Sequence, residues 1–498
     1  MIPGLAARGL ALAALAVALT VAFTGARPGA QPQARPNILL VIADDWSFPD
    51  AGALGNPGVR TPAFDRIARE GVRFTHAYAA APSCTASRGA ILTGRWPHEL
   101  GSGGNLWSAL PAGYDTYPDL LERAGYVIGL QGKGWGPGNV EAGGRTRNPA
   151  GPSFESFQAF LAQAPPDRPF AFWLGPSDPH RPYEAGLAAR TGLTRDRAMV
   201  PPTLPDVPAV RDDLLDYYAE IERFDHTLGE AVALLESAGR LEDTMVIVTG
   251  DNGRPFPRDK ANVYDGGARV PLAIRYPARL DRRRGPLRSV PAETDALVSL
   301  IDLAPTILEA AGVTPPSEMS GLTLTSTFPG ADGDAHRDRH RRVFVERERH
   351  AYVREGNLGY PVRAVRTHDF LYVRNFAPDR WPAGDPVRVW AVGPFGDVDD
   401  GPSKWFVLAY RDDPEIASLY RLAFAKRPAE ELYALAADPH QLVNVAGQPP
   451  HASAQQRLRE MLDRWMRDTG DPRATSDADP WSAYEYFGAP TPWPVPPD

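Results

Sequence analysis

Residues 37–45 read Asn-Ile-Leu-Leu-Val-Ile-Ala-Asp-Asp. This run of aliphatic side chains predicts a β-strand that ends at two carboxylates. Three further short apolar runs follow along the chain, and each also leads into polar or charged residues. They are Tyr126–Leu130, Phe170–Leu174 and Met245–Val248. Amphipathic stretches lie between the runs, and this alternation predicts an α/β fold on a mostly parallel sheet.

The helices expected between these runs have recognisable ends. Thr61 is a predicted N-cap, Pro62 suits the first helical position, and Gly71 suits the stop of the same helix. Further helices are expected over residues 117–124, over residues 212–238 with a break, and over residues 297–311.

The polar residues after the four runs are candidates for one shared site. They are Asp44 and Asp45, Lys133, Asp178 and His180, and Asp251 and Asn252. In an open, mostly parallel sheet, ligands bind outside the carboxyl ends of the strands, so we expect these residues to converge. Carboxylate and amide oxygens are the ligands of a hard divalent cation, and a loop histidine suits a general acid.

The single cysteine of the chain, Cys84, stands at a predicted helix start. It belongs to the stretch Pro-Ser-Cys-Thr-Ala-Ser-Arg, residues 82–88, which reads as a loop that enters a helix. One cysteine cannot form an intramolecular disulfide, so Cys84 is either a packed core residue or a reactive group. A helix N-terminus favours anions, which makes this position suitable for anion chemistry.

The composition restricts the class of protein. The chain has 498 residues, of which 43% are hydrophobic, and 53 basic against 61 acidic residues give a net charge of −8. This balance argues against a nucleic-acid partner. Lysine is rare and occurs only at Lys133, Lys260, Lys404 and Lys426. A compact cation is therefore an unusual choice here, and an anion-binding site would explain it.

The two ends of the chain differ from its centre. Residues 1–30 have the layout of an export signal, with Arg8 before an apolar stretch from Leu10 to Phe23. This signal predicts a secreted or periplasmic protein with no stable membrane insertion after cleavage; an uncleaved anchor is the alternative. After about residue 375 proline, glycine and aspartate become frequent. We expect residues 376–498 to form a smaller α+β unit with an extended surface tail from Asp471.

The stretch around Cys84 is similar to the signature of the type I sulfatases, in which this cysteine is oxidised to formylglycine. Thr93-Gly94-Arg95 continues the likeness, as do Asp44-Asp45, Asp251-Asn252-Gly253 and residues 266–271. Within the family, the chain most resembles the sulfamidase (N-sulfoglucosamine sulfohydrolase) branch. The supporting stretches are residues 251–257, 299–308, 360–363, 431–433 and 438–440.

This resemblance implies an alkaline-phosphatase-like mixed sheet sandwiched by helices over residues 36–375, followed by the C-terminal unit. It implies calcium-dependent hydrolysis of sulfate ester or sulfamate groups on sulfated carbohydrate, through formylglycine installed by the formylglycine-generating enzyme. The implied calcium ligands are Asp44, Asp45, position 84, Asp251 and Asn252. The implied roles of the other residues are orientation by Arg88, sulfate binding by Lys133 and Lys260, proton donation by His180, and substrate contact by Asp178 and Arg363.

Three residues depart from the family pattern. Ala86 replaces the usual proline of the signature, Trp135 replaces a histidine that follows the family lysine, and Lys260 replaces the arginine of the sulfamidases. His98 is a candidate for the role of the missing histidine. Two alternative functions stay open: hydrolysis of phosphoesters or phosphonate monoesters by the same superfamily, and binding of sulfated glycans by a degenerate sulfatase.

Overall fold

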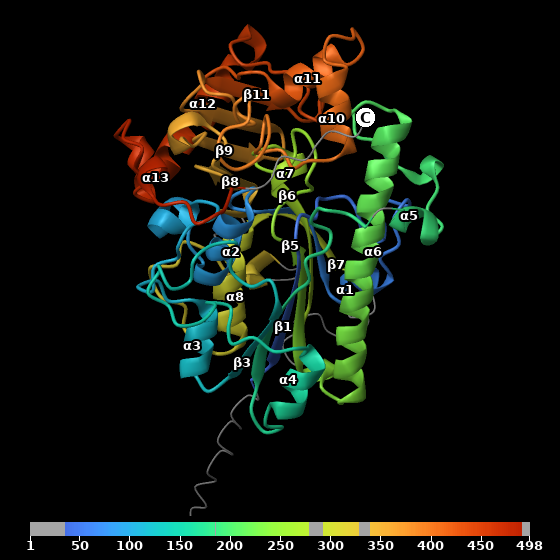
Figure 1. Cartoon of the computed structure of the whole chain (residues 1–498). Coiled ribbons are helices and arrows are strands. Elements are labelled where there is room, and N and C mark those ends of the chain that lie inside the picture. Colours follow the sequence, from blue (N-terminus) through green and yellow to red (C-terminus); the bar gives the residue numbers. More distant parts are fainter. Residues whose placement is uncertain (1–34, 185, 278–291, 328–338, 491–498) are drawn as a thin grey trace, which may run out of the picture. The chain divides into compact units, whose positions relative to one another are not determined.

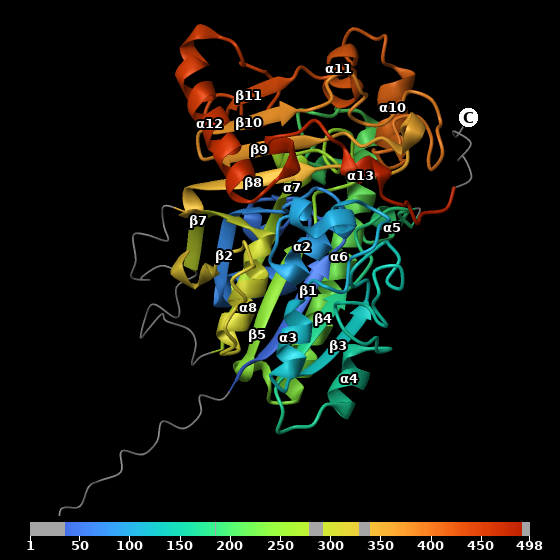
Figure 2. The same cartoon turned by 90° about the vertical axis from the view of Figure 1, so that its left-hand side faces the viewer.

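The computed structural model describes residues 35–184, 186–277, 292–327 and 339–490. The expected export signal, residues 1–30, lies outside this range. Residues from Pro36 onward belong to one unit, and they contain a seven-stranded sheet in the order β3-β4-β1-β5-β6-β2-β7. The figures show this sheet between two layers of helices (Figures 1 and 2).

The four predicted strands lie side by side and run parallel. They are β1 (Asn37–Ala43), β3 (Val127–Gly132), β4 (Phe170–Gly175) and β5 (Thr244–Gly250). The sheet is mixed because β6 (Arg269–Arg275) is antiparallel to both β5 and β2 (Val72–Tyr78). The last strand, β7 (Ala292–Ser299), pairs in parallel with β2. The predicted α/β class with a mixed sheet is confirmed.

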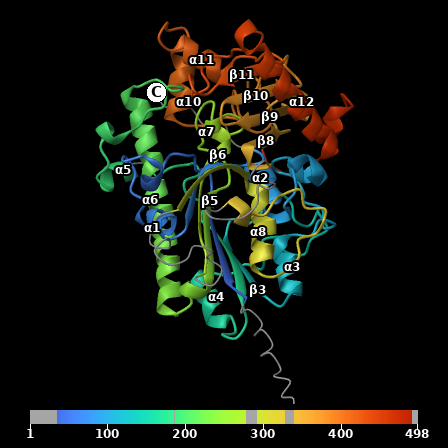
Figure 3. The ribbon, with the colours of Figure 1, turned by 180° about the vertical axis from the view of Figure 1, so that it is seen from behind.

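Alternate side chains of β1 enter two separate cores. Ile38, Leu40 and Ile42 face α2 (Cys84–Thr93), α3 (Tyr117–Arg123) and α8 (Leu303–Ala310). Leu39, Val41 and Ala43 face α1 (Pro62–Glu70), α4 (Phe157–Gln163) and α6 (Pro208–Ser237). Figure 3 shows α1 and α6 on one side of the sheet and α3 and α8 on the other. A strand covered on both faces reads as a nearly continuous apolar run, as residues 38–43 of β1 do.

Two helix predictions need correction. The helix expected to break within residues 212–238 is the continuous α6, which begins at Pro208 and ends at Ser237. The helix expected from residue 297 begins at Leu303, because Leu297 and Val298 complete strand β7 beside His76 and Ala77 of β2. That strand partner lies about 220 residues away in the sequence, so a local pattern cannot reveal it.

A second sheet is antiparallel and has the order β11-β10-β9-β8. Its strands are β8 (Arg342–Arg347), β9 (Val362–Thr367), β10 (Phe370–Asn375) and β11 (Glu430–Ala434), and α12 (Ala452–Asp468) packs on it. Three of these strands precede the expected domain boundary at residue 376. The composition changes only in the loop after β10, whereas the fold changes at β8.

The remaining helices are short. They are α5 (Leu187–Arg190), α7 (Asp265–Ala268), α10 (Pro402–Ala409), α11 (Ala417–Phe424) and α13 (Pro480–Ala483). Part of the segment expected to be an extended surface tail is packed within residues 471–490: Trp481 is only 2% exposed, and its carbonyl accepts a hydrogen bond from Asn105 Nδ2. Among the described residues, no helix is long and apolar enough to span a membrane.

Candidate active site

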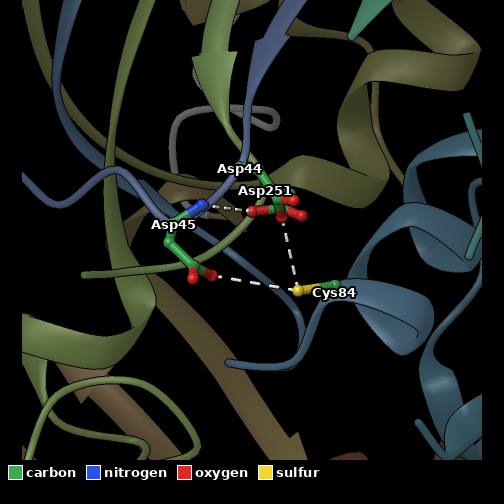
Figure 4. A group of neighbouring side chains, drawn as sticks. All are labelled: Asp44, Asp45, Cys84 and Asp251. Atoms are coloured by element: carbon green, nitrogen blue, oxygen red, sulfur yellow. Dashed lines mark hydrogen bonds between the residues drawn. The ribbon is translucent and has the colours of Figure 1, made fainter. Parts of the chain in front are cut away.

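Two pairs of oxygen ligands meet at one edge of the large sheet. Asp44 and Asp45 follow β1, and Asp251 and Asn252 follow the neighbouring parallel strand β5. The backbone N–H of Asp45 donates to Asp251 Oδ1 over 3.0 Å, which ties the two strand ends together (Figure 4). One ligand atom from each of Asp44, Asp45, Cys84 and Asp251 lies within 4.8 Å of the others, and all four residues are buried.

Cys84 is the first residue of α2 and points at the carboxylates (Figure 4). Its Sγ lies 3.4 Å from Asp44 Oδ1 and 3.8 Å from Asp45 Oδ1. Burial raises the pKa of the thiol well above its ordinary value; the nearby lysines oppose this shift, and Asp251 and Asp44 add to it. The thiol is therefore neutral at physiological pH, and a neutral thiol is a weak nucleophile.

The cationic side chains of Arg88, Lys133 and Lys260 contact the carboxylates. Arg88, one helical turn after Cys84, places Nε 2.7 Å from Asp251 Oδ2 and donates through Nη1 to the carbonyl of Lys133 over 2.7 Å. The Nζ atom of Lys133 lies 2.6 Å from Asp44 Oδ2. Burial raises the pKa of Asp251 to about 6, although Arg88 acts in the opposite direction. The site thus holds a dense set of opposed charges away from solvent.

Lys260 contacts a second carboxylate of this cluster. Its Nζ lies 2.7 Å from Asp45 Oδ2 and 2.9 Å from Asp399 Oδ2. Asp399 belongs to the segment between β10 and α10, so the C-terminal part of the chain reaches into the site.

The residues at this edge fit a hard divalent cation. Asn252 donates through Nδ2 to Asp45 Oδ1 and to the carbonyl of Gly253, while its buried Oδ1 finds no hydrogen-bond partner among the described residues. A buried amide oxygen without a partner is costly unless a ligand satisfies it. Together with the carboxylates of Asp44, Asp45 and Asp251, it forms an all-oxygen set of the kind that calcium prefers.

A cavity of about 860 Å³ opens beside this cluster. Six of the predicted site residues line it: Asp44, Cys84, Lys133, Asp178, His180 and Lys260. His180 is partly exposed, its Nδ1 contacts the carbonyl of Arg181, and its Nε2 lies 3.7 Å from Asp45 Oδ2. Asp178 pairs with Arg223 of α6, which also lines the cavity.

Arg363 and His98 do not line this cavity, which corrects two expectations. Arg363 is fully buried in β9, with Nε 2.6 Å from Asp471 Oδ2 and Nη2 2.7 Å from Glu348 Oε1. His98 places Nδ1 3.0 Å from both carboxylate oxygens of Glu346, which also pairs with Arg363. Arg363 and His98 thus form buried ion pairs that connect the second sheet to the segments packed against it. Buried charges of this kind require partners of opposite sign.

The sequence analysis missed several cavity residues, among them His350, Asp399 and Tyr486. Each of these three comes from the C-terminal half of the chain, and none belongs to a strand-end pattern. Tyr486 lies in the segment expected to be a surface tail. Only contacts between distant segments bring these residues to the site, so no local signal could have found them.

Comparison with known proteins places the chain. A family model described as sulfatase matches residues 36–142 and 151–313, more than half of the sequence. The chain belongs to the sulfatase family. It is therefore an enzyme that hydrolyses sulfate ester or sulfamate groups. A second model, N-sulphoglucosamine sulphohydrolase, C-terminal, matches residues 256–381 of this sulfatase.

Individual relatives agree with this placement. This sulfatase is 29% identical over 488 residues to human N-sulphoglucosamine sulphohydrolase, an alignment that covers 88% of this chain and 91% of the relative. It is 26% identical over 489 residues to an ulvan-active sulfatase of Formosa agariphila, with 87% and 75% coverage.

Solved structures share the fold. One, solved with its substrate D-glucosamine-2-N,6-O-disulfate, has a TM-score of 0.61 at 20% identity and covers 89% of this chain and 100% of its own. The phosphonate monoester hydrolase of Agrobacterium radiobacter has a TM-score of 0.58 at 18% identity, with 87% and 96% coverage.

Proposed function

We propose that this sulfatase removes sulfate ester or sulfamate groups from sulfated carbohydrate and depends on calcium and on formylglycine made from Cys84. The observation that carries the proposal is that three carboxylates converge on position 84 while two lysine Nζ atoms contact two of these carboxylates. The amide of Asn252, which donates to Asp45, also has a buried oxygen without a partner among the described residues. A site with this composition suits a cation and a sulfate group together.

Formylglycine at position 84 would supply a hydroxyl nucleophile, and calcium held by Asp44, Asp45, Asp251, Asn252 and position 84 would supply Lewis acidity. The raised pKa of the Cys84 thiol supports the modification, since the unmodified side chain is neutral and weakly nucleophilic. The unpartnered Oδ1 of Asn252 supports the metal.

Lys133 and Lys260 would bind the oxygens of the sulfate group. Their Nζ atoms contact Asp44 and Asp45, respectively, and both lysines line the cavity. Charge on the sulfate oxygens shifts during the reaction, and fixed cations in a buried site stabilise it strongly. Arg88 would hold Asp251 and the backbone of Lys133 in place.

His180 would protonate the leaving alcohol or amine. Its Nδ1–H donates to the carbonyl of Arg181, which fixes the ring and leaves Nε2 on the side of the reacting groups, near Asp45. A histidine whose Nε2 faces the reacting groups can donate a proton to the leaving group. Asp178, held by Arg223, would contact the substrate on the same side of the cavity.

The cavity walls suit a sugar ring. Asp178, Arg223 and Asn148 offer polar groups, whereas Trp107, Trp135 and Tyr486 offer aromatic surface. Trp107 has a φ of 52°, a conformation that bulky residues adopt rarely and that clusters at binding sites. The named relatives act on or carry sulfated sugars: N-sulphoglucosamine, ulvan and glucosamine disulfate.

A substrate panel tests the proposal. Enzyme produced together with a formylglycine-generating enzyme should release sulfate from N-sulfated or O-sulfated glucosamines, and Cys84→Ala should fold but release none. The mass of the Cys84 peptide should show the aldehyde or its hydrate. A higher kcat/KM for phosphate or phosphonate esters would favour the alternative hydrolase, whereas an unmodified thiol with sugar binding but no turnover would favour the glycan-binding alternative.

We further propose that the chain is exported and matured by a formylglycine-generating enzyme, despite Ala86 in the signature. The apolar stretch from Leu10 to Phe23 supports export. Sequencing the N-terminus of protein from the culture medium or periplasm tests this; an intact Met1 in a membrane fraction would instead support an uncleaved anchor.

A further inference from the structure

His350 is a second histidine that lines the cavity, and it comes from the segment after the second sheet's strand β8. Its Nδ1 lies 2.9 Å from the hydroxyl oxygen of Ser83, the residue directly before Cys84. The side chain is 4% exposed and lines the cavity together with Cys84 and Lys260. The adjacent Ala351 packs in the same apolar cluster as Cys84.

The surroundings of His350 keep its imidazole neutral. Burial lowers its pKa to about 4; Asp397 and Asp399 oppose this shift, and Lys260 and Arg347 add to it. His180 stands in a different environment, because a third of its side chain is exposed and Nε2 faces Asp45. When two titratable groups of one site have contrasting environments, they commonly divide the roles of acid and base.

The contact with Ser83 allows the tautomer that carries the proton on Nδ1, because the Ser83 hydroxyl can accept a hydrogen bond as well as donate one. A neutral imidazole has one N–H donor and one lone-pair acceptor. When Nδ1–H donates to Ser83 Oγ, the lone pair resides on Nε2. Trp135, two residues after Lys133 at the end of β3, cannot accept a proton, because its indole N–H is a donor only. The buried Nε1 of Trp135 has no hydrogen-bond partner among the described residues.

We propose that His350 accepts the proton of the hydroxyl group carried at position 84, and that it thereby takes over a role that Trp135 cannot fill. This inference rests on the proposed formylglycine. In the step, the O–H bond breaks, the proton moves to Nε2 of His350, and the electron pair stays on the oxygen. The proton leaves the imidazole to water in the cavity at the end of the cycle. His180 then serves the leaving group and His350 serves the nucleophile.

Kinetics of His350→Gln and His350→Ala test this role, with His76→Gln as the matched control. His76 is likewise a histidine whose pKa burial lowers, to about 3, but it lies on β2 and does not line the cavity. We expect kcat to fall by about 10²- to 10⁴-fold in both His350 variants, with KM within roughly twofold of the wild type. Added imidazole should restore part of the activity of His350→Ala, and His76→Gln should match the wild type.

Two further readouts separate this role from maturation and from folding. The formylglycine content of the Cys84 peptide, measured by mass spectrometry, should equal that of the wild type in every variant. Nitrogen NMR of histidine-labelled protein should show His350 neutral near pH 7, and its Nε2 resonance should shift when Cys84 is converted to formylglycine. A kcat within about threefold of the wild type, a rise in KM alone, or an unchanged Nε2 resonance would each overturn the inference. The NMR comparison needs no turnover, so a failure of the proposed substrate class would be recognised separately.

Discussion

Lys260 Nζ lies 2.7 Å from Asp45 Oδ2, although 215 residues separate them in the chain. The contact joins the end of β1 to the loop after β5 and places a buried cation directly beside the proposed calcium ligands. Asp399, from the C-terminal part of the chain, also contacts this Nζ, at 2.9 Å. Lys260 therefore has a fixed position before any substrate arrives, which lowers the cost of binding a sulfate oxygen.

Replacing Lys260 by alanine should lower kcat/KM for sulfate release by about 10²- to 10³-fold, since a preorganised charge is removed from the transition state. Lys260→Arg should retain more activity because the charge persists. Steady-state kinetics measure both effects. Lys426→Ala is the control, since Lys426 is exposed and does not line the cavity. Equal losses in Lys260→Ala and Lys426→Ala would contradict a specific role.

Removal of calcium should inactivate the enzyme and lower its melting temperature. Without a cation, the carboxylates of Asp44, Asp45 and Asp251 lie close together in a buried site. A ligand that binds only the folded state stabilises it. Treatment with a chelator, followed by calcium or magnesium, tests this by scanning calorimetry and sulfate release. Calcium should restore both properties, and magnesium should restore them poorly because it demands a smaller octahedral site. Full activity after chelation would rule out the metal.

Tyr486→Ala should weaken substrate binding more than the chemical step. The Tyr486 ring packs at 85° against both Tyr352 and Trp390, which stack on each other with centroids 5.1 Å apart, and it lines the cavity. Loss of one aromatic surface costs about 1 kcal/mol, which corresponds to a rise in KM of roughly fivefold. Tyr410→Ala, at an exposed tyrosine, is the control. A fall in kcat with KM unchanged would argue against a sugar-binding wall.

Arg363→Met should destabilise the fold rather than alter substrate binding. The change removes the arginine that pairs with the buried Asp471 and leaves Glu348 with Arg473 alone, and the loss of one partner of a buried ion pair costs about 3–5 kcal/mol. Urea unfolding measures this, with Arg464→Ala on the exposed face of α12 as the control. If stability were unchanged and KM rose instead, Arg363 would belong to the substrate pocket after all.

The buried pair of His98 and Glu346 should make the folded state less stable as the pH rises. Burial alone would lower the pKa of His98, but the Glu346 carboxylate outweighs it and raises the pKa above its ordinary value. The stabilising charge pair is fully present below about pH 6.5 and is lost as the pH rises through the raised pKa. As the pH rises above about 6.5, the unfolding free energy of the wild type should therefore fall more steeply than that of His98→Gln. Equal slopes, or a large loss of kcat in the variant, would contradict this structural role.

Local sequence patterns were sufficient to predict half of the site. Asp44, Asp251 and Asn252 directly follow buried parallel strands, and Cys84 begins a helix. Short stretches of sequence therefore indicated both that these strands are parallel and that the residues after them lie close together. The resemblance to the sulfatases added the family, because its motifs are equally local. Neighbouring parallel strands end at the same edge of the sheet, so the residues that directly follow them lie close together in space.

Long-range packing decided the rest. His350 and Tyr486 reach the cavity only because the second sheet and the C-terminal segment pack beside α2, and Arg363 is removed from it because β9 pairs with β8 and places Arg363 opposite Glu346. The sequence by itself determined the strands, the family and the residues at the strand ends, which depend on neighbours in the chain. The tertiary structure decided the walls of the cavity and the partners of buried charges, since these depend on register and on contacts between segments hundreds of residues apart.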